Sequence, residues 1–175
     1  MPHILCLSGS LRAASSSKAV VETIRLKLSA EAGFSTFDIG SLPHYNADLD
    51  PLPETVVALK TAIAEADGLI IVTPEYNYSV PGVLKNAIDW ASRPGYASVM
   101  KGKPVFIASV SGGALGGVRA QAHMKNVLGA VLAQTFVWQE VAITHANAKV
   151  KDGLLVDEAT ETFLFEALRA YFAGL

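Results

Sequence analysis

The sequence predicts one α/β domain over residues 1–175, with a doubly wound, five-stranded parallel sheet of strand order 2-1-3-4-5 and helices on both faces. Short apolar runs alternate with amphipathic helical patterns along the whole chain, as in βαβ units. The run Gly68–Val72 is apolar throughout, which is typical of a strand buried on both faces. Hydrophobic residues make up 51% of the 175 positions, which is enough for one full core.

The first half of the chain supplies three of the strands. The apolar run His3–Leu7 predicts the first strand, and the apolar periodicity over Lys18–Ala30 predicts an amphipathic helix. The second strand, Phe34–Ile39, is closed by a glycine and a proline. Two further prolines open a helix over Pro51–Glu65, because proline is tolerated in the first helical turn. Gly68–Val72 is then the third strand.

The second half continues the same alternation of helices and strands. From the apolar patterns and the glycines and prolines between them, we expect helices over Gly82–Ala91, Val118–Leu132 and Glu158–Phe172, and strands over Pro104–Val110 and Phe136–Ile143.

Three connections have neither a helical pattern nor a strongly apolar one. They are Ser8–Ser17, Thr73–Pro81 and Ser111–Gly117, and they follow the first, third and fourth predicted strands. In a doubly wound sheet, ligands bind beyond the carboxyl ends of strands at the point where the strand order reverses. The sequence therefore predicts that the three loops meet there and form one site.

The first loop has the composition of a phosphate site. It leads from a buried strand to a helix N-terminus, where free amides and the helix dipole favour an anion. It lacks the Gly-Lys-Ser/Thr ending of a triphosphate loop and the GxGxxG pattern of a dinucleotide loop. The alternative is a polar turn with a serine N-cap. The candidate phosphate ligands are Ser10, Arg12, Ser15, Ser16 and Ser17.

The second loop has the composition of a site for a planar ring. Its prolines restrict the backbone and lower the entropy cost of holding a ligand. Exposed amides can bond the edge of a heterocycle while Tyr76 or Tyr78 lies against it. The alternative is a rigid turn with surface tyrosines. The candidate residues are Pro74, Glu75, Tyr76 and Asn77.

The third loop has four glycines in six positions, so its backbone can approach a ligand closely. The candidates here are Ser111, Gly112 and Gly113, and a merely flexible connection is the alternative. The segment also approaches the G-x-S-x-G elbow of α/β-hydrolases, but further glycines stand where a helix should begin. His145 has no evident acid partner, so a hydrolase is disfavoured.

Composition excludes several classes of protein. A net charge of −2 gives no basic field for nucleic acid. No stretch reaches the ~18 apolar residues of a membrane span, and the N-terminus lacks the features of a signal peptide. The single cysteine, Cys6, excludes an internal disulfide and reads as a buried inert thiol. The histidines lack metal-ligand spacing. We therefore expect a cytoplasmic protein without a metal.

At the three loops the sequence resembles the NAD(P)H-dependent FMN reductases, in particular the chromate and quinone reductase branch of this flavodoxin-like family. The first loop carries Gly9–Arg12 with Ser15 and Ser17. The second carries Thr73–Gly82, continued by Leu84–Trp90, and this long motif is the most specific part. The third carries Gly116-Gly117-x-Arg119-x-Gln121. The family often has asparagine at Ser17, although a hydroxyl can still donate to phosphate.

The resemblance implies an oxidoreductase that holds FMN without a covalent bond. It places the phosphate at the first loop and the flavin ring along Pro74–Asn77 and near Ser111. NADH or NADPH would give a hydride to flavin N5, and a small acceptor such as a quinone, chromate or an azo compound would then use the same face, which predicts ping-pong kinetics. Electron-transfer flavodoxins and non-catalytic flavin-binding modules are the rivals, although −2 is a weak charge for the acidic docking surface of a carrier.

Assembly is expected from composition as well. The helices after the second and third loops carry more large apolar residues than one buried stripe needs, which predicts a homodimer or homotetramer. The resemblance implies the same, because relatives are commonly dimers or tetramers with the flavin near the interface. Tyr78 and Arg119 are then candidate cross-subunit contacts, with ordinary surface packing as the alternative.

Overall fold

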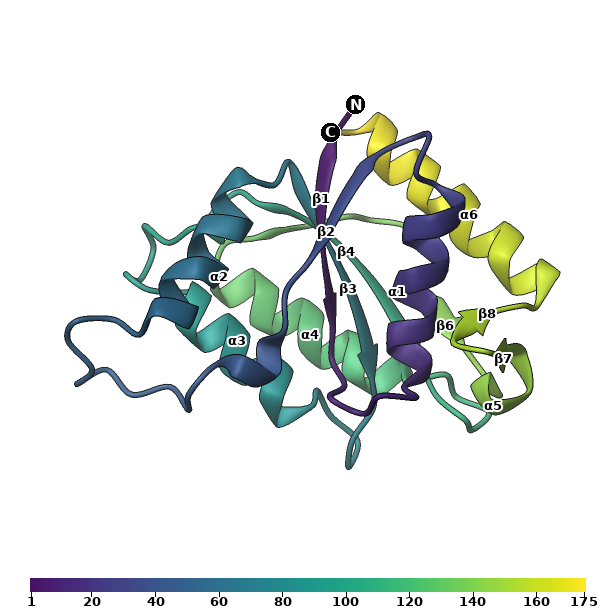
Figure 1. Cartoon of the computed structure of the whole chain (residues 1–175), viewed down its shortest axis with the longest axis horizontal. Coiled ribbons are helices and arrows are strands. Elements are labelled where there is room, and N and C mark those ends of the chain that lie inside the picture. Colours follow the sequence, from purple (N-terminus) through teal and green to yellow (C-terminus); the bar gives the residue numbers. More distant parts are fainter.

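A parallel sheet runs through the middle of the protein in the computed structural model, which describes all of residues 1–175 (Figure 1). Its order is β2-β1-β3-β4-β5, with the short strand β6 also paired to β4, so the predicted order 2-1-3-4-5 is confirmed. Every pairing in this sheet is parallel. The strands are β1 His3–Ser8, β2 Gly33–Thr36, β3 Gly68–Pro74, β4 Pro104–Val110, β5 Gln134–Thr135 and β6 Val141–Ile143.

Helices cover both faces of this sheet, as predicted (Figure 1). On one face lie α1 (Ser16–Lys27) and α6 (Glu158–Ala173), and on the other lie α2 (Glu54–Glu65), α3 (Gly82–Ala91) and α4 (Val118–Ala130). No helix is long and apolar enough to cross a membrane.

The pleat of the strands divides the core into two layers. In β1, Ile4 and Cys6 pack under α1 and α6, whereas Leu5 and Leu7 pack under the other three helices. This alternation follows from the period of two in a strand, and it requires apolar residues at every position of a strand covered on both faces. The continuous apolar runs of the sequence are therefore explained by the two helical layers.

Apolar residues of α3 and α4 serve this core rather than an interface. Leu84, Trp90, Met124 and Leu128 are each at most 2% exposed within the single chain. The indole of Trp90 also donates to the carbonyl of Pro43 at 2.8 Å. The inference that these helices have surplus apolar residues was therefore wrong for these positions.

The predicted fifth strand, Phe136–Ile143, is divided in two. Short strands β5 and β6 both pair with β4, and the chain between them leaves the sheet with Val137 90% exposed. The buried amide of Gln121 donates to the carbonyl of Val141 at 2.8 Å, so a side chain bonds the backbone here. An apolar run alone does not reveal such a break.

Other boundaries also differ from the prediction. The second strand ends at Thr36, and a 3₁₀ turn η1 (Ile39–Ser41) follows, capped by Asp38, whose Oδ1 accepts from the Gly40 amide at 3.0 Å. Helix α1 begins at Ser16 and α2 at Glu54, so both prolines of the predicted helix lie before it, with Pro53 at the N-cap. A short helix and a hairpin before α6 were not predicted from the sequence; they are α5 Ala146–Lys149, β7 Val150–Lys151 and β8 Leu154–Leu155.

Candidate functional site

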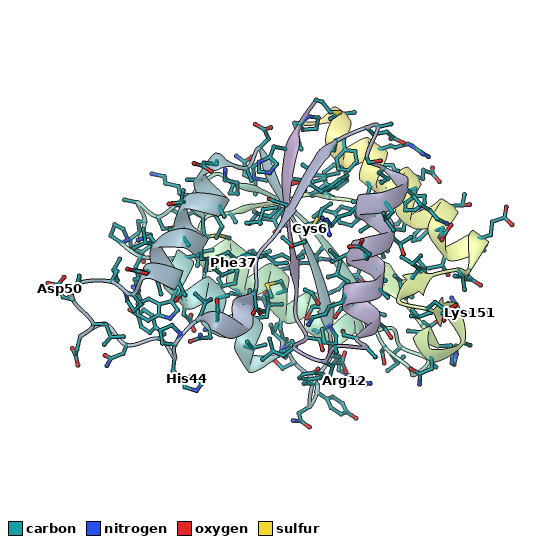
Figure 2. The ribbon with its side chains drawn as sticks, in the orientation of Figure 1. Cys6, Arg12, Phe37, His44, Asp50 and Lys151 are labelled. Atoms are coloured by element: carbon teal, nitrogen blue, oxygen red, sulfur yellow. The ribbon has the colours of Figure 1, made fainter.

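The loops after β1, β3 and β4 meet at the carboxyl edge of the sheet, as predicted. Figure 2 shows Arg12 of the first loop at this edge, below the ends of the strands. The hydroxyls of Ser10 and Tyr76 lie 3.2 Å apart and join the first loop to the second. Gly9 packs so closely on β3 that an added Cβ would lie 3.0 Å from the ring of Pro74. The site is thus assembled by tight backbone packing at the switch point.

The first loop brings hydroxyl groups together at the start of α1. Ser17 Oγ lies 2.9 Å from Ser8 Oγ and 2.7 Å from Ser15 Oγ; Ser15 and Ser17 are buried and Ser8 is half-buried. No side chain caps α1, so its first amides are available to a ligand. Arg12 is exposed, and its guanidinium makes no hydrogen bond within the chain. Ser16, the remaining candidate, is half-buried in the first turn of α1.

The second loop is a tight turn with a strained tip. Tyr76 and Ser79 exchange backbone hydrogen bonds of 3.0 Å, and the two residues between them, Asn77 and Tyr78, have φ of 49° and 68°. Positive φ at both central positions is the geometry of a type I′ turn, which costs energy for a tyrosine. Ser79 Oγ is 2.9 Å from Nδ1 of His123 on α4, which holds the turn in place.

Glu75 contributes its side chain to the scaffold rather than to the open edge. One carboxylate oxygen accepts from the amides of Arg119 and Ala120 in the first turn of α4, at 3.1 and 3.4 Å. The other oxygen pairs with the Arg119 guanidinium at 3.1 Å. That guanidinium lies 4.1 Å above the ring of Tyr78. Glu75 therefore ties the second loop to the helix that follows the third.

The third loop is fixed at its base and open at its tip. Ser109 Oγ donates to the Gly116 carbonyl at 2.6 Å and accepts from the Gln121 amide at 2.9 Å, all in the interior. Gly112 and Gly113 are exposed, and Ser111 is half-buried beside them. Such a loop presents backbone to a ligand without side chains in the way.

The segment after β6 supports this loop, a role that was not predicted from the sequence. The amide of His145 donates to the Gly113 carbonyl at 3.1 Å, and the side-chain amide of Asn147 packs against Gly112. Both residues directly follow a strand that ends at the same edge of the sheet. Their position after a strand of the parallel sheet was the signal that could have indicated this role.

The geometry does not support a hydrolase or a metal site. Ser111 Oγ accepts from the Gly113 amide at 3.1 Å and bonds no histidine, and α4 begins only at Val118. No group of three or more histidine, cysteine or carboxylate side chains could hold a metal ion. What remains is a candidate anion site beside an open, glycine-rich edge with exposed tyrosines. Together with the fold, this defines a flavodoxin-like α/β protein with a site for a phosphorylated planar ligand.

Comparison with known proteins gives the family. The model of the NADPH-dependent FMN reductases matches residues 2–148, and the chain therefore belongs to this family. The 2-hydroxy-1,4-benzoquinone reductase of Burkholderia sp is 41% identical over 97% of this chain and 94% of that relative. A quinone reductase of Escherichia coli (strain K12) is 44% identical over 72% of this chain and 69% of its own.

A solved structure agrees with this assignment. FerB, a flavoenzyme NAD(P)H:(acceptor) oxidoreductase from Paracoccus denitrificans, superposes with a TM-score of 0.89 at 38% identity, covering 99% of this chain and 96% of its own. The protein is thus an oxidoreductase with FMN as its flavin cofactor and NAD(P)H as its electron donor.

The residues present fit an FMN group. The uncapped start of α1 and the gathered hydroxyls suit a dianionic phosphate, and the exposed glycines of the third loop leave room for a ring.

Proposed function

We propose that this protein reduces quinones and similar small electron acceptors, such as chromate or azo compounds, with electrons from NADH or NADPH. Support comes from the two relatives named for quinone reduction, which are 41% and 44% identical to this chain. The single observation that carries the proposal is the open edge formed by the three loops. It gives a small molecule access without a partner protein.

Two groups of residues are proposed to hold FMN. Phosphate binding is assigned to the side chains of Arg12 and the serines at 10, 15, 16 and 17, together with the first amides of α1. Ring binding is assigned to the backbone of Pro74–Asn77, the ring of Tyr76 and the backbone of Ser111–Gly113. Glu75 would act through its backbone, because its carboxylate is engaged with α4.

These residues would bind and orient rather than react. FMN, when bound, supplies the chemistry by accepting a hydride from the nicotinamide and passing electrons to the acceptor. The amides of the second and third loops would fix the ring at its polar edge. Tyr76, which is 43% exposed, would cover part of the ring and exclude water from it. No side chain is needed as a nucleophile.

Assembly into a homodimer or homotetramer is proposed on different grounds from those of the sequence. Large side chains of the three loops stand exposed at this edge: Leu11 at 52%, Tyr78 at 67% and Leu115 at 53%. A second subunit would cover such a rim.

A cytoplasmic location is proposed as well. It is supported by the free, buried thiol of Cys6, because a reducing compartment keeps cysteine thiols unpaired.

Turnover without a partner tests the proposal. The purified protein, loaded with FMN, should oxidise NADH or NADPH when only a small quinone is added. A flavodoxin-type carrier or a flavin-binding module would hold the same cofactor but give no steady-state turnover under these conditions. That result would exclude the proposed activity.

A further inference from the structure

A cavity of about 640 Å³ lies beside the first loop, and the proposed binding of the flavin ring does not use it. Its walls come from α1, from the segment that runs through the end of β2 into η1, and from Val150 and Gly153 of the hairpin before α6. Cys6 and Phe37, which are labelled in Figure 2, are among its lining residues. Ser10 and Ser15 of the first loop also line it, but no residue of the second or third loop does. The cavity therefore extends from the phosphate loop away from the ring. Its volume is within the range of about 300–1,000 Å³ for small-molecule sites.

Charged groups of both signs line this cavity. Lys18 and Arg25 stand on α1, and Asp38 stands on the opposite wall, two residues after β2. Glu22 is paired with Arg25 at 2.7 Å, but Arg25 Nε is buried and has no hydrogen-bond partner. Asp38 uses only Oδ1, as the acceptor for the Gly40 amide, so Oδ2 is free. Glu22 also lines the cavity, and Lys18 Nζ donates to the Leu11 carbonyl at 3.2 Å. The lining thus offers two cationic groups on α1, one of them paired with Glu22, and the Asp38 carboxylate on the opposite wall.

This combination matches a ribonucleotide better than a simple anion or an apolar ligand. In the dinucleotide-binding doubly wound folds, an acidic residue near the end of the second strand accepts a hydrogen bond from a ribose hydroxyl. This chain lacks the GxGxxG loop of those folds, but Asp38 stands at the corresponding place after β2. Lys18 and Arg25 can bind a phosphate through charge-assisted hydrogen bonds. Apolar lining residues, including Val21 and Ile39, suit a base.

We propose that the cavity binds the adenosine 5′-phosphate part of a dinucleotide, with Asp38 on the ribose hydroxyls. The inference deepens the proposed function and rests on it, because the first loop is taken as the flavin phosphate site. Two molecules carry this group next to a flavin or nicotinamide: the donor NADH and the flavin FAD. A ribose bound to Asp38 favours NADH over NADPH, since the carboxylate repels a 2′-phosphate.

Binding of 5′-AMP to the FMN-loaded protein tests the site directly by calorimetry. The wild type should bind AMP, and Asp38→Asn should weaken it about tenfold, because a charged acceptor is lost. Asparagine keeps an oxygen for the Gly40 amide, so η1 is retained. Thr36→Trp places a large side chain at an exposed position that lines the cavity, so it should fill the cavity and also weaken the binding of AMP. Asp48→Asn, on a surface carboxylate outside the cavity, is the matched control and should leave AMP binding unchanged.

Two further measurements distinguish the sources of the adenosine group. If it comes from the donor, Asp38→Asn raises the KM for NADH relative to that for reduced nicotinamide mononucleotide, which lacks adenosine. If it comes from the flavin, the substitution lowers the affinity of the apoprotein for FAD relative to FMN. Either result supports the site.

The failure of this inference is separate from the failure of the proposed function. A wild type that binds no FMN, or that does not oxidise NADH with a quinone, overturns the function. A wild type that does both, but binds no AMP at millimolar concentration, overturns the adenosine site alone. So does AMP binding that neither Asp38→Asn nor Thr36→Trp weakens.

Discussion

Replacing Glu75 by glutamine tests whether one carboxylate joins the second loop to α4. The carboxylate accepts from two backbone amides of α4 and from the Arg119 guanidinium, and the side chain is only 13% exposed. Hydrogen bonds to a charged group stabilise by about 1.5–3 kcal/mol and neutral ones by about 1 kcal/mol. Glu75→Gln keeps the shape but loses the charge, so it should cost roughly 1–2 kcal/mol of unfolding free energy.

Thermal denaturation of the apoprotein, followed by circular dichroism, measures this loss. For a chain of this size, 1 kcal/mol lowers Tm by about 2–4 °C, so a loss of 1–2 kcal/mol should lower Tm by about 2–8 °C. Glu140→Gln is the matched control, because Glu140 pairs with Lys125 at 2.6 Å but is 47% exposed. An exposed pair contributes about 1 kcal/mol at most. Equal Tm values for both variants, or no decrease for Glu75→Gln, would refute the proposed role of the carboxylate.

Three further predictions follow from the loops and the core. Arg12→Ala should weaken the binding of FMN by about 1.5–3 kcal/mol in fluorescence titrations, and the binding of riboflavin, which lacks the phosphate, much less. Equal losses for the two ligands would show that Arg12 does not bind the phosphate. Gly116 has φ of +60°, and a Cβ added to it would lie 2.8 Å from the Ala142 backbone. Gly116→Ala should therefore lower the free energy of unfolding, measured by urea denaturation, by about 2 kcal/mol or more. Gly113→Ala is the control and should leave it unchanged. Burial raises the pKa of Cys6 to about 12 from 9.0, so the thiol ionises at lower pH in the unfolded chain than in the folded protein. The free energy of unfolding should therefore fall above pH 9, by about 1–2 kcal/mol at pH 10. Cys6→Ala should reduce this decrease.

The parts of the fold that depend on burial were predictable from the sequence. A strand covered on both faces must be apolar at each position, so Gly68–Val72 indicated the centre of a two-layered sheet. Glycine, serine and proline then marked the loops at its carboxyl edge. Both signals are local in the chain, and both were confirmed.

The parts that depend on a single tertiary contact were not predictable. The break between β5 and β6 accompanies the bond from the Gln121 amide to Val141, 20 positions away. The role of the Glu75 carboxylate depends on where α4 begins relative to the second loop. Asn147 belongs to a segment that no apolar pattern revealed. The spacing of residues in the sequence predicts which residue types lie at the carboxyl edge of the sheet. It does not predict which backbone groups their side chains contact.

Steady-state kinetics with FMN, NADH and a small quinone tests the central claim most directly. The rate of NADH oxidation is measured while the quinone concentration is varied at several fixed NADH concentrations, with no other protein present. Because donor and acceptor are proposed to use the same open edge in turn, double-reciprocal plots should give parallel lines. Protein that retains FMN but does not oxidise NADH until a partner protein is added would contradict the claim.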